Sequence, residues 1–232
     1  MEYSAIISVY NEQDSIRPLY YSLRKVMDGL GKSYEIIFVN DGSTDRTLDI
    51  LESLCCEKNY LVVVNFIKNQ GQSAAYREGF DRARGEIIIT MDGDLQNDPK
   101  DIPKLLYKLK EGYDVVCGWR RTRRDPFIIK LLSTMANLYR RLTLGEKLHD
   151  VNCSLRVYKK ESLKSIDLPG HMYYMLTAIL AASGYKINEV EINHYPRKFG
   201  KSKFNIWKRI LLFNCLLVLK YLYNKNKYKK IR

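Results

Sequence analysis

Residues 86–99 read EIIITMDGDLQNDP, a short apolar run followed by a cluster of polar and acidic side chains. The run over 86–91 is rich in isoleucine, which is typical of a strand that is buried on both faces. Asp98 followed by Pro99 favours a helix start, because aspartate caps a helix and proline fits its first turn. The stretch therefore predicts a buried strand, a polar turn and a helix.

The same order of strand, polar turn and helix recurs along the chain. Apolar runs predict further strands at 4–9, 34–39, 61–66 and 113–119, and apolar residues at helical spacing predict helices at 14–29, from a cap at 44 or 45 to about 56, and at 73–84. Strands that alternate with helices over short connections form a parallel sheet with helices on both faces. We therefore expect an α/β fold with a Rossmann-like, mostly parallel sheet.

The second half of the chain alternates less regularly. It predicts helices at 127–142 and 173–183 and strands at 154–158 and 186–192. No linker rich in Pro, Gly or Ser divides the halves, and no internal repeat is present. We therefore expect one domain over 1–203, followed by an amphipathic helix and a basic tail over 204–232.

Three clusters of polar side chains follow three of the predicted strands. They span 10–12, 40–43 and 92–96. The carboxyl ends of parallel strands meet at one edge of a sheet, and ligands bind there in open α/β folds. We therefore expect the three clusters to line one site.

Asp92 and Asp94 are the strongest candidates in these clusters. Two carboxylates separated by one residue can share a hard divalent cation, and a diphosphate leaving group needs such a cation. The pair alone is a weak motif that also occurs in solvated loops, so its place between a strand and Gln96 supports the interpretation. Asp41 either accepts hydrogen bonds from a base or completes a turn, and Glu12 either grips ribose hydroxyls or ends a helix.

The composition is that of a folded domain with a strongly basic carboxyl-terminal part. The 232 residues are 46% hydrophobic and 28% charged, which argues against a disordered chain. Residues 192–232 hold twelve Lys or Arg and no Asp or Glu, while the whole chain has a net charge of +13. Such a tail predicts an anionic partner, which is nucleic acid, phospholipid or a phosphorylated substrate. The five cysteines lack metal-ligand spacing, so we expect buried free thiols.

Several stretches combine into a recognisable series. They are VYNE (9–12), VNDGSTD (39–45), NQGQSAAYREGF (69–80) and MDGDLQNDP (91–99). This series resembles glycosyltransferase family 2, whose members have the GT-A fold. With DVNCSLRVYKKESL (150–163) and INHYPRKFGKSKFNIWKR (192–209), the chain is most similar to the dolichyl- or polyprenyl-phosphate sugar transferases of that family.

The resemblance implies roles for the residues at matching positions. The nucleoside would be held by Tyr10, Glu12 and Asp41, and Mg²⁺ or Mn²⁺ with the donor diphosphate would be held by Asp92, Asp94 and Gln96. The acceptor phosphate would be bound by Arg120, and the phosphates would be covered by Arg197, Ser202 and Lys203. Asp150 matches a position proposed as a base. Ser8 stands where such enzymes usually have a proline, and 171–174 also departs from the family pattern. These departures leave the sugar and the acceptor open.

The chemistry of the acceptor separates two hypotheses. A sugar hydroxyl must lose a proton, so transfer to a glycan needs a general base, for which Asp150 is the obvious candidate. A phosphate oxygen is already anionic and needs positioning and charge, which arginine supplies. The arginine candidates are Arg120, Arg121, Arg123, Arg124, Arg140 and Arg141. Most of them also fit a solvated basic face, and we expect Arg120 to bind the phosphate.

The segment 204–223 is apolar and aromatic, but its longest uncharged stretch covers only 210–219. A spanning helix needs about twenty apolar residues. We expect an interfacial helix whose basic tail, 225–232, rests on anionic lipid headgroups, although the segment also fits a core helix.

The leading hypothesis is therefore transfer of a sugar from a UDP- or GDP-linked donor to a polyprenyl phosphate. The protein would be peripheral at the cytoplasmic face of a membrane, would need Mg²⁺ or Mn²⁺ and would bind no nucleic acid; a membrane-protein partner or a homo-oligomer stays open. The alternatives are a family 2 enzyme that acts on a glycan hydroxyl, and a non-catalytic basic protein that binds nucleic acid or membranes. The last alternative leaves Asp92, Asp94 and Gln96 without a role.

Overall fold

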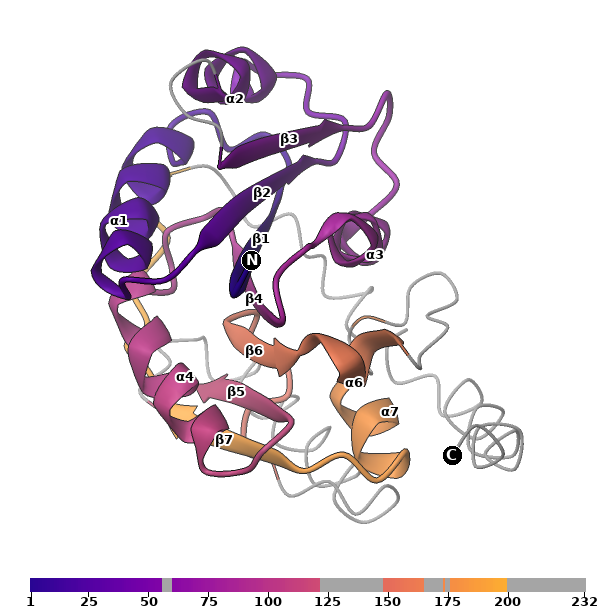
Figure 1. The fold of residues 1–232 in the computed structure, drawn as a ribbon. Helices are drawn as coiled ribbons and strands as arrows, with labels where there is room; N and C mark the ends of the chain where they lie inside the picture. Colours follow the sequence, from indigo (N-terminus) through magenta and orange to yellow (C-terminus); the bar gives the residue numbers. More distant parts are fainter. Residues whose placement is uncertain (56–59, 122–147, 165–172, 174–175, 200–232) are drawn as a thin grey trace.

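The computed structural model describes residues 1–55, 60–121, 148–164, 173 and 176–199. These residues form a seven-stranded sheet in the order β3-β2-β1-β4-β6-β5-β7 (Figure 1). The strands are β1 (Tyr3–Val9), β2 (Tyr34–Asn40), β3 (Leu61–Asn65), β4 (Ile87–Asp92), β5 (Val115–Trp119), β6 (Arg156–Lys159) and β7 (Ile187–Glu191). The helices are α1 (Ile16–Gly29), α2 (Thr47–Cys55), α3 (Gln72–Arg82), the short 3-10 helix η1 (Pro99–Asp101), α4 (Ile102–Lys110), α6 (Lys160–Lys164) and α7 (Leu176–Ala182).

The sheet is mixed but mostly parallel, as the sequence predicts. β1 pairs in parallel with β2 and β4, β2 with β3, and β5 with β7. β6 is antiparallel to both of its neighbours, β4 and β5. The apolar run predicted at 154–158 is thus a strand, but its pattern does not reveal its direction.

Two hydrophobic clusters lie on opposite faces of the sheet. Residues of α1, α2 and α4 pack with Tyr3, Ala5 and Ile7 of β1, whereas residues of α3 and α7 pack in a second cluster with Ile6. This alternation follows from the two-residue period of a strand. Figure 1 shows α1 and α4 along one side of the sheet and α3 and α7 along the other, so helices cover both faces as expected.

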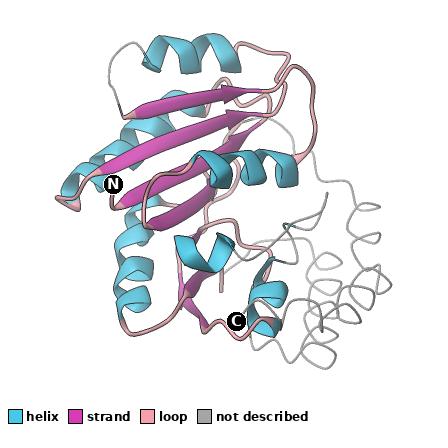
Figure 2. Cartoon of the chain, turned by 45° about the vertical axis from the view of Figure 1, so that its right-hand side comes forward, coloured by secondary structure: helices cyan, strands magenta, loops and turns pink. Residues whose placement is uncertain are grey.

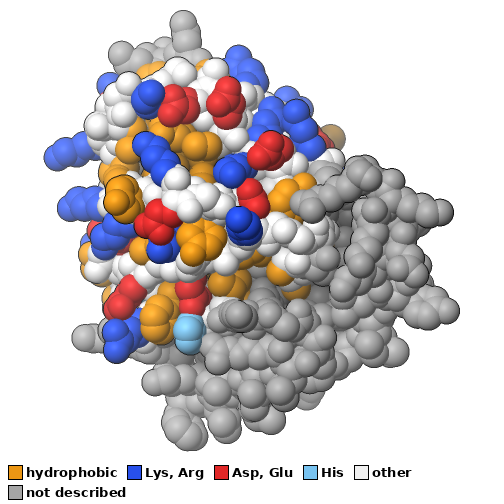
Figure 3. Space-filling model, turned by 60° about the horizontal axis from the view of Figure 1, so that its bottom comes forward, with side chains coloured by type: hydrophobic (Ala, Val, Ile, Leu, Met, Phe, Trp, Pro, Cys, Tyr) orange, Lys and Arg blue, Asp and Glu red, His pale blue; other side chains and the backbone are white. Residues whose placement is uncertain are grey.

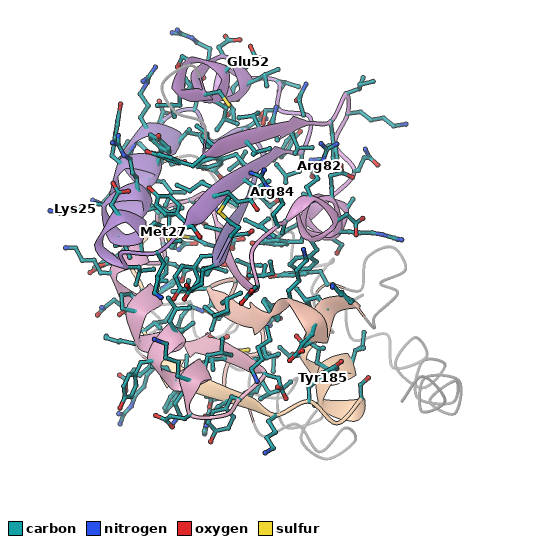
Figure 4. All side chains as sticks on the ribbon, in the orientation of Figure 1. Lys25, Met27, Glu52, Arg82, Arg84 and Tyr185 are labelled. Carbon is teal, nitrogen blue, oxygen red and sulfur yellow. The ribbon has the colours of Figure 1, made fainter. Side chains whose placement is uncertain are left out.

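The helix α1 illustrates how the sequence produces this packing. Its buried residues recur at spacings of three and four, which places them on one stripe. They are Ile16, Leu19, Tyr20, Leu23 and Met27. Figure 4 shows Met27 directed toward the sheet and Lys25 directed away from it. Burying this stripe stabilises the helix far more than its intrinsic propensity does.

The strands β1, β2 and β4 end at the same edge of the sheet. Val9 lies opposite Asn40 in the pair β1–β2, and Ser8 lies opposite Asp92 in the pair β1–β4. The chain builds outward from β1 to β2 and β3, then returns to place β4 on the other side of β1 (Figure 2). The strand order reverses at this point, which is where open α/β sheets form their ligand crevice.

Some elements differ from the prediction at their ends. The helix expected to start at a cap at 44 or 45 begins at Thr47, whose N–H donates to Asp45 Oδ1 at 3.0 Å. The helix expected at Asp98 begins with η1, and Asp98 accepts from the N–H of Lys100 at 3.0 Å. The short helix α6 was not predicted.

Other predictions fall on residues outside the described part of the chain. The helices expected at 127–142 and 204–223 lie there, and so does the domain boundary expected after 203. Within the described residues, no helix is both long enough and apolar enough to cross a membrane.

Candidate active site at the sheet edge

Hydrogen bonds join the loops that follow β1 and β2. The N–H of Asn11 donates to Ser43 Oγ at 2.9 Å, and the N–H of Thr44 donates to Asn11 Oδ1 at 2.7 Å. Asn11 has a φ of 52°, a left-handed conformation that asparagine adopts more readily than most residues. The N–H of Glu12 donates to Thr47 Oγ1 at 2.9 Å. The first two polar clusters therefore form one unit, as their strand positions predict.

Asp41 is buried and holds the segment that leads into α3. Its Oδ1 accepts from the N–H of Gln70 at 2.7 Å, and its Oδ2 accepts from the N–H of Gly71 and from Asn69 Nδ2, both at 2.9 Å. Burial raises the pKa of Asp41, and the backbone donors partly oppose this rise. Gly42 has a φ of 67°, and a Cβ there would lie 2.4 Å from the backbone of the loop after β3. Glycine therefore lets the two loops touch.

Asp92 ends β4 and receives hydrogen bonds from α3. Its Oδ1 accepts from Gln72 Nε2 at 2.6 Å and from the hydroxyl of Tyr76 at 3.2 Å. Burial raises the pKa of Asp92, and the hydrogen bonds of Ser154 and Tyr76 partly lower it. The sequence assigned no role to Gln72 or Tyr76. Gln72 could have been found because it begins the helix that follows β3 and so lies near this edge, whereas Tyr76 falls on the apolar stripe of that helix.

Asp94 is also buried and is paired with an arginine from far along the chain. Burial raises the pKa of Asp94 most, and the negative charge of Asp92 raises it further. Arg197 Nη2 lies 2.7 Å from Asp94 Oδ2, and Arg197 Nη1 lies 2.9 Å from Glu12 Oε1. Arg197 therefore joins the acidic turn to the loop after β1, and its contact with the phosphates stays a prediction.

The segment after β7 runs along the acidic turn and delivers Arg197. The N–H of Tyr195 donates to the carbonyl of Gln96 at 2.9 Å, and Gln96 Nε2 donates to the carbonyl of Tyr195 at 3.4 Å. Asp101 anchors the same segment by accepting from the N–H of Asn193 at 2.8 Å. The side chain of Gln96 thus contacts this segment, and its role as a metal ligand stays a prediction.

Arg120 and Asp150 form a bidentate ion pair. Arg120 Nε lies 2.6 Å from Asp150 Oδ2, and Arg120 Nη2 lies 2.9 Å from Asp150 Oδ1. The two side chains are only 12% and 7% exposed. Burial opposes the charge of Arg120, but the hydrogen bonds and charge of Asp150 raise its pKa overall. The charge of Arg120 also lowers the pKa values of Asp92 and Asp94, so it acts within electrostatic reach of the acidic pair.

The acidic pair fits a Mg²⁺ or Mn²⁺ ion that is shared with a substrate. Among the described residues, no group of three or more His, Cys, Asp or Glu could hold a metal alone. Mg²⁺ is commonly held by one or two carboxylates together with substrate phosphates. Asp92 and Asp94 supply such carboxylates, and the repulsion between them favours an added positive charge. In this structure the guanidinium of Arg197 supplies that charge to Asp94.

The remaining predicted residues are placed as follows. Tyr10 follows β1 and is partly buried, and Ser202 and Lys203 lie outside the described residues. Arg121 lies on the surface, where it pairs with the exposed Glu191 at 3.4 Å. The nucleoside contacts expected of Tyr10, Glu12 and Asp41 stay predictions.

Comparison with known proteins identifies relatives over most of the chain. The family described as glycosyl transferase family 2 matches residues 4–167. The dodecaprenyl-phosphate galacturonate synthase of Rhizobium johnstonii is 40% identical over 212 residues. The match covers 89% of this chain and 62% of that protein, so the chain spans less than two thirds of the length of this relative.

Solved structures show the same fold. The glucosyl-3-phosphoglycerate synthase from Mycobacterium tuberculosis, in complex with phosphoglyceric acid, matches with a TM-score of 0.68 and 19% identity over 86% of this chain and 73% of that chain. Its complex with Mn²⁺, UDP-glucose and phosphoglyceric acid gives a TM-score of 0.67 and 20% identity over 86% and 72% of the two chains. These matches confirm the expected GT-A-like α/β fold.

Proposed function

Because the chain belongs to glycosyltransferase family 2, we propose that it transfers a sugar from a nucleotide-sugar to a polyprenyl phosphate, with Mg²⁺ or Mn²⁺ as cofactor. The observation that carries this proposal is the bidentate pairing of Arg120 with Asp150, beside the acidic pair at the sheet edge. This pairing fixes the guanidinium of Arg120 as a cation for an anionic acceptor. It also occupies the carboxylate of Asp150, which a hydroxyl acceptor would need as a general base.

The donor half of the proposal rests on Asp92 and Asp94. These two carboxylates would hold the cation, which when bound neutralises charge on the diphosphate as that group leaves. Arg197 lies against Asp94 and Glu12 and supplies a guanidinium for the phosphate oxygens. The loops after β1 and β2 form the neighbouring wall, where the nucleoside would lie.

The acceptor half rests on Arg120. Asp150 binds its Nε and Nη2, which fixes the plane of the guanidinium and directs its other N–H groups elsewhere. A phosphate oxygen held there would attack the anomeric carbon, and the bond from that carbon to the diphosphate would break. No proton has to be removed, because the attacking oxygen is already anionic.

A glycan hydroxyl fits this arrangement less well. Such an acceptor needs a general base, and both oxygens of Asp150 are bonded to a permanently charged guanidinium. This pairing favours the ionised carboxylate and so weakens it as a proton acceptor. The relative from Rhizobium, a dodecaprenyl-phosphate galacturonate synthase, supports a lipid phosphate as acceptor and makes galacturonate the first sugar to test. A lipid acceptor also supports location at the cytoplasmic face of a membrane.

The test is transfer by the purified full chain. UDP- and GDP-linked sugars, including galacturonate, would be supplied with Mn²⁺ and either a polyprenyl phosphate or a polyprenol that lacks the phosphate. We expect a sugar–lipid product from the phosphate alone, detected by mass spectrometry. Product from the polyprenol or a glycan, with none from the phosphate, would contradict the proposal.

Two variants separate the acceptor chemistries. Arg120→Lys keeps the charge but loses the bidentate geometry, so we expect the KM for polyprenyl phosphate to rise at least about tenfold. Asp150→Asn should have a similar effect on KM, since it releases Arg120. Complete loss of kcat in Asp150→Asn, with an unchanged acceptor KM, would instead identify Asp150 as a base.

A further inference from the structure

The helix α3 reaches the acidic pair with two side chains from its first two turns. Gln72 and Tyr76 are four residues apart and therefore lie on one face of the helix. Both donate to the same oxygen of Asp92, Gln72 Nε2 at 2.6 Å and the Tyr76 hydroxyl at 3.2 Å. Neither contact belongs to the substrate-binding roles discussed above.

The two donors are held rigidly. The ring of Tyr76 is fully buried and stacks on Tyr173, with ring centroids 4.1 Å apart and planes 16° apart. The hydroxyl of Tyr173 lies 3.3 Å from Thr90 Oγ1, which fixes the second ring. The helix itself sits close to β1, because a Cβ on Gly79 would lie 2.4 Å from the side chain of Ile6. Gln72 and Tyr76 therefore present their donors from a fixed helix.

A carboxylate offers about four lone-pair directions. Gln72 and Tyr76 both donate to Oδ1 of Asp92, and these bonds restrict the direction in which the carboxylate can accept a cation. Partners that orient a metal ligand commonly change metal affinity by about 10–100-fold when they are removed. We propose that Gln72 and Tyr76 are positioning residues that set the affinity of Asp92 for the divalent cation.

This proposal rests on the proposed function in one respect, namely that Asp92 binds a cation. It adds that α3 must orient Asp92. The residues just before α3, Asn69 to Gly71, also donate hydrogen bonds to Asp41. The two acidic positions on either side of β1 are thereby tied to one short segment of chain. A shift of α3 would disturb both of them together.

The experiment measures Mn²⁺ binding to the full chain at a fixed concentration of UDP or GDP, which supplies the diphosphate oxygens, by the electron paramagnetic resonance signal of free Mn²⁺. We expect Tyr76→Phe to raise the Kd about three- to tenfold and Gln72→Ala to raise it at least about tenfold. Tyr76→Phe keeps the stacked ring, so its thermal midpoint should confirm that the fold is intact.

Tyr173→Phe is the matched control. It removes a hydroxyl from the neighbouring ring of the same stack, and that hydroxyl bonds to Thr90 Oγ1 at 3.3 Å. We expect its Kd for Mn²⁺ to equal that of the wild type. Wild-type affinity in both Tyr76→Phe and Gln72→Ala, or equal weakening by Tyr173→Phe, would overturn the proposal.

The outcomes also separate this proposal from the proposed function. Wild-type protein that binds Mn²⁺ but transfers no sugar would refute the transfer reaction and leave the positioning roles standing. Mn²⁺ binding that is absent, or unchanged in Asp92→Asn, would refute the positioning roles whatever the transfer assay shows.

Discussion

Asp92 and Asp94 show at the scale of single residues how a fold can maintain a reactive site. Burial raises the pKa values of both carboxyls, and for Asp94 the charge of Asp92 adds to the rise. The folded protein therefore keeps two carboxylates that water would stabilise better. A divalent cation relieves this cost, which is why functional sites often concentrate such groups.

The raised pKa values predict a pH dependence of metal binding. A carboxyl must lose its proton before it binds a cation, and these two hold their protons to a higher pH than an ordinary aspartate. As the pH falls, we expect Mn²⁺ affinity to begin to weaken above the range in which an ordinary aspartate titrates, by up to about tenfold per pH unit for each proton displaced. Calorimetric titration at several pH values measures this. Affinity that stays constant until the pH reaches the range of an ordinary aspartate would contradict the assignment.

At the scale of elements, a buried carboxylate holds the strands that carry the site. Glu35 of β2 is 1% exposed and accepts from Ser4 Oγ at 2.6 Å and from the N–H of Arg84 at 2.7 Å. Arg84, which is labelled in Figure 4, also pairs with it through Nη2 at 2.8 Å. Burial alone would raise the pKa of Glu35, but these bonds lower it overall. Glu35 thus joins β1, β2 and the segment after α3.

Removing this carboxylate should destabilise the fold. Glu35→Ala leaves a buried hydroxyl and a backbone N–H without their partner, so we expect a loss of about 2–4 kcal/mol in the free energy of unfolding at pH 7. Because folding lowers the pKa of Glu35, its contribution to stability is fully present when the pH is above the ordinary pKa of a glutamate. The contribution is lost as the pH falls through the lowered pKa of the folded protein. Urea unfolding at pH 7 and at acid pH measures both effects.

The matched control is Glu78→Ala on the exposed face of α3. Glu78 pairs with Arg82 at 2.6 Å, but both side chains are accessible to water. We expect a change within about 0.5 kcal/mol. If both variants lost the same free energy of unfolding, the claim that the buried bonds of Glu35 stabilise the fold would be wrong.

The elements also show what the sequence could and could not predict. Apolar runs followed by polar clusters predicted the strands and their common edge, because each signal is local. The direction of β6 was not predictable, since an apolar run has the same pattern in either direction. Tyr76 falls on the apolar stripe of a helix, so its hydroxyl bond to Asp92 had no local signal. The pairing of Arg120 with Asp150 joins positions thirty residues apart, and only the folded chain brings them together.

At the scale of the whole molecule, the positive charge is unevenly distributed along the chain. On the face shown in Figure 3, the described residues mix Lys and Arg with Asp, Glu and hydrophobic side chains. By contrast, residues 192–232 hold twelve Lys or Arg and no acidic residue. The sequence therefore predicts that attraction to an anionic membrane comes mainly from this part of the chain.

Binding to vesicles tests this expectation. The full chain should sediment with vesicles that contain phosphatidylserine and less with neutral vesicles. Each basic residue near the membrane surface should contribute about 1 kcal/mol to the free energy of binding. The difference should shrink as salt rises, because salt screens the attraction. Replacing the basic residues of 225–232 with glutamine should weaken binding to the anionic vesicles. Equal binding to neutral vesicles at all salt concentrations would contradict an electrostatic contribution.

The central claim is that two carboxylates at the end of β4 gather a divalent cation against a nucleoside diphosphate. Calorimetric titration of UDP and of GDP into the full chain, with and without Mn²⁺, tests it most directly. We predict that one of them binds at least about tenfold more tightly with Mn²⁺, and that Asp92→Asn and Asp94→Asn each abolish this difference. Nucleotide affinity that is the same with and without Mn²⁺, or a Mn²⁺ effect that persists in both variants, would contradict the account.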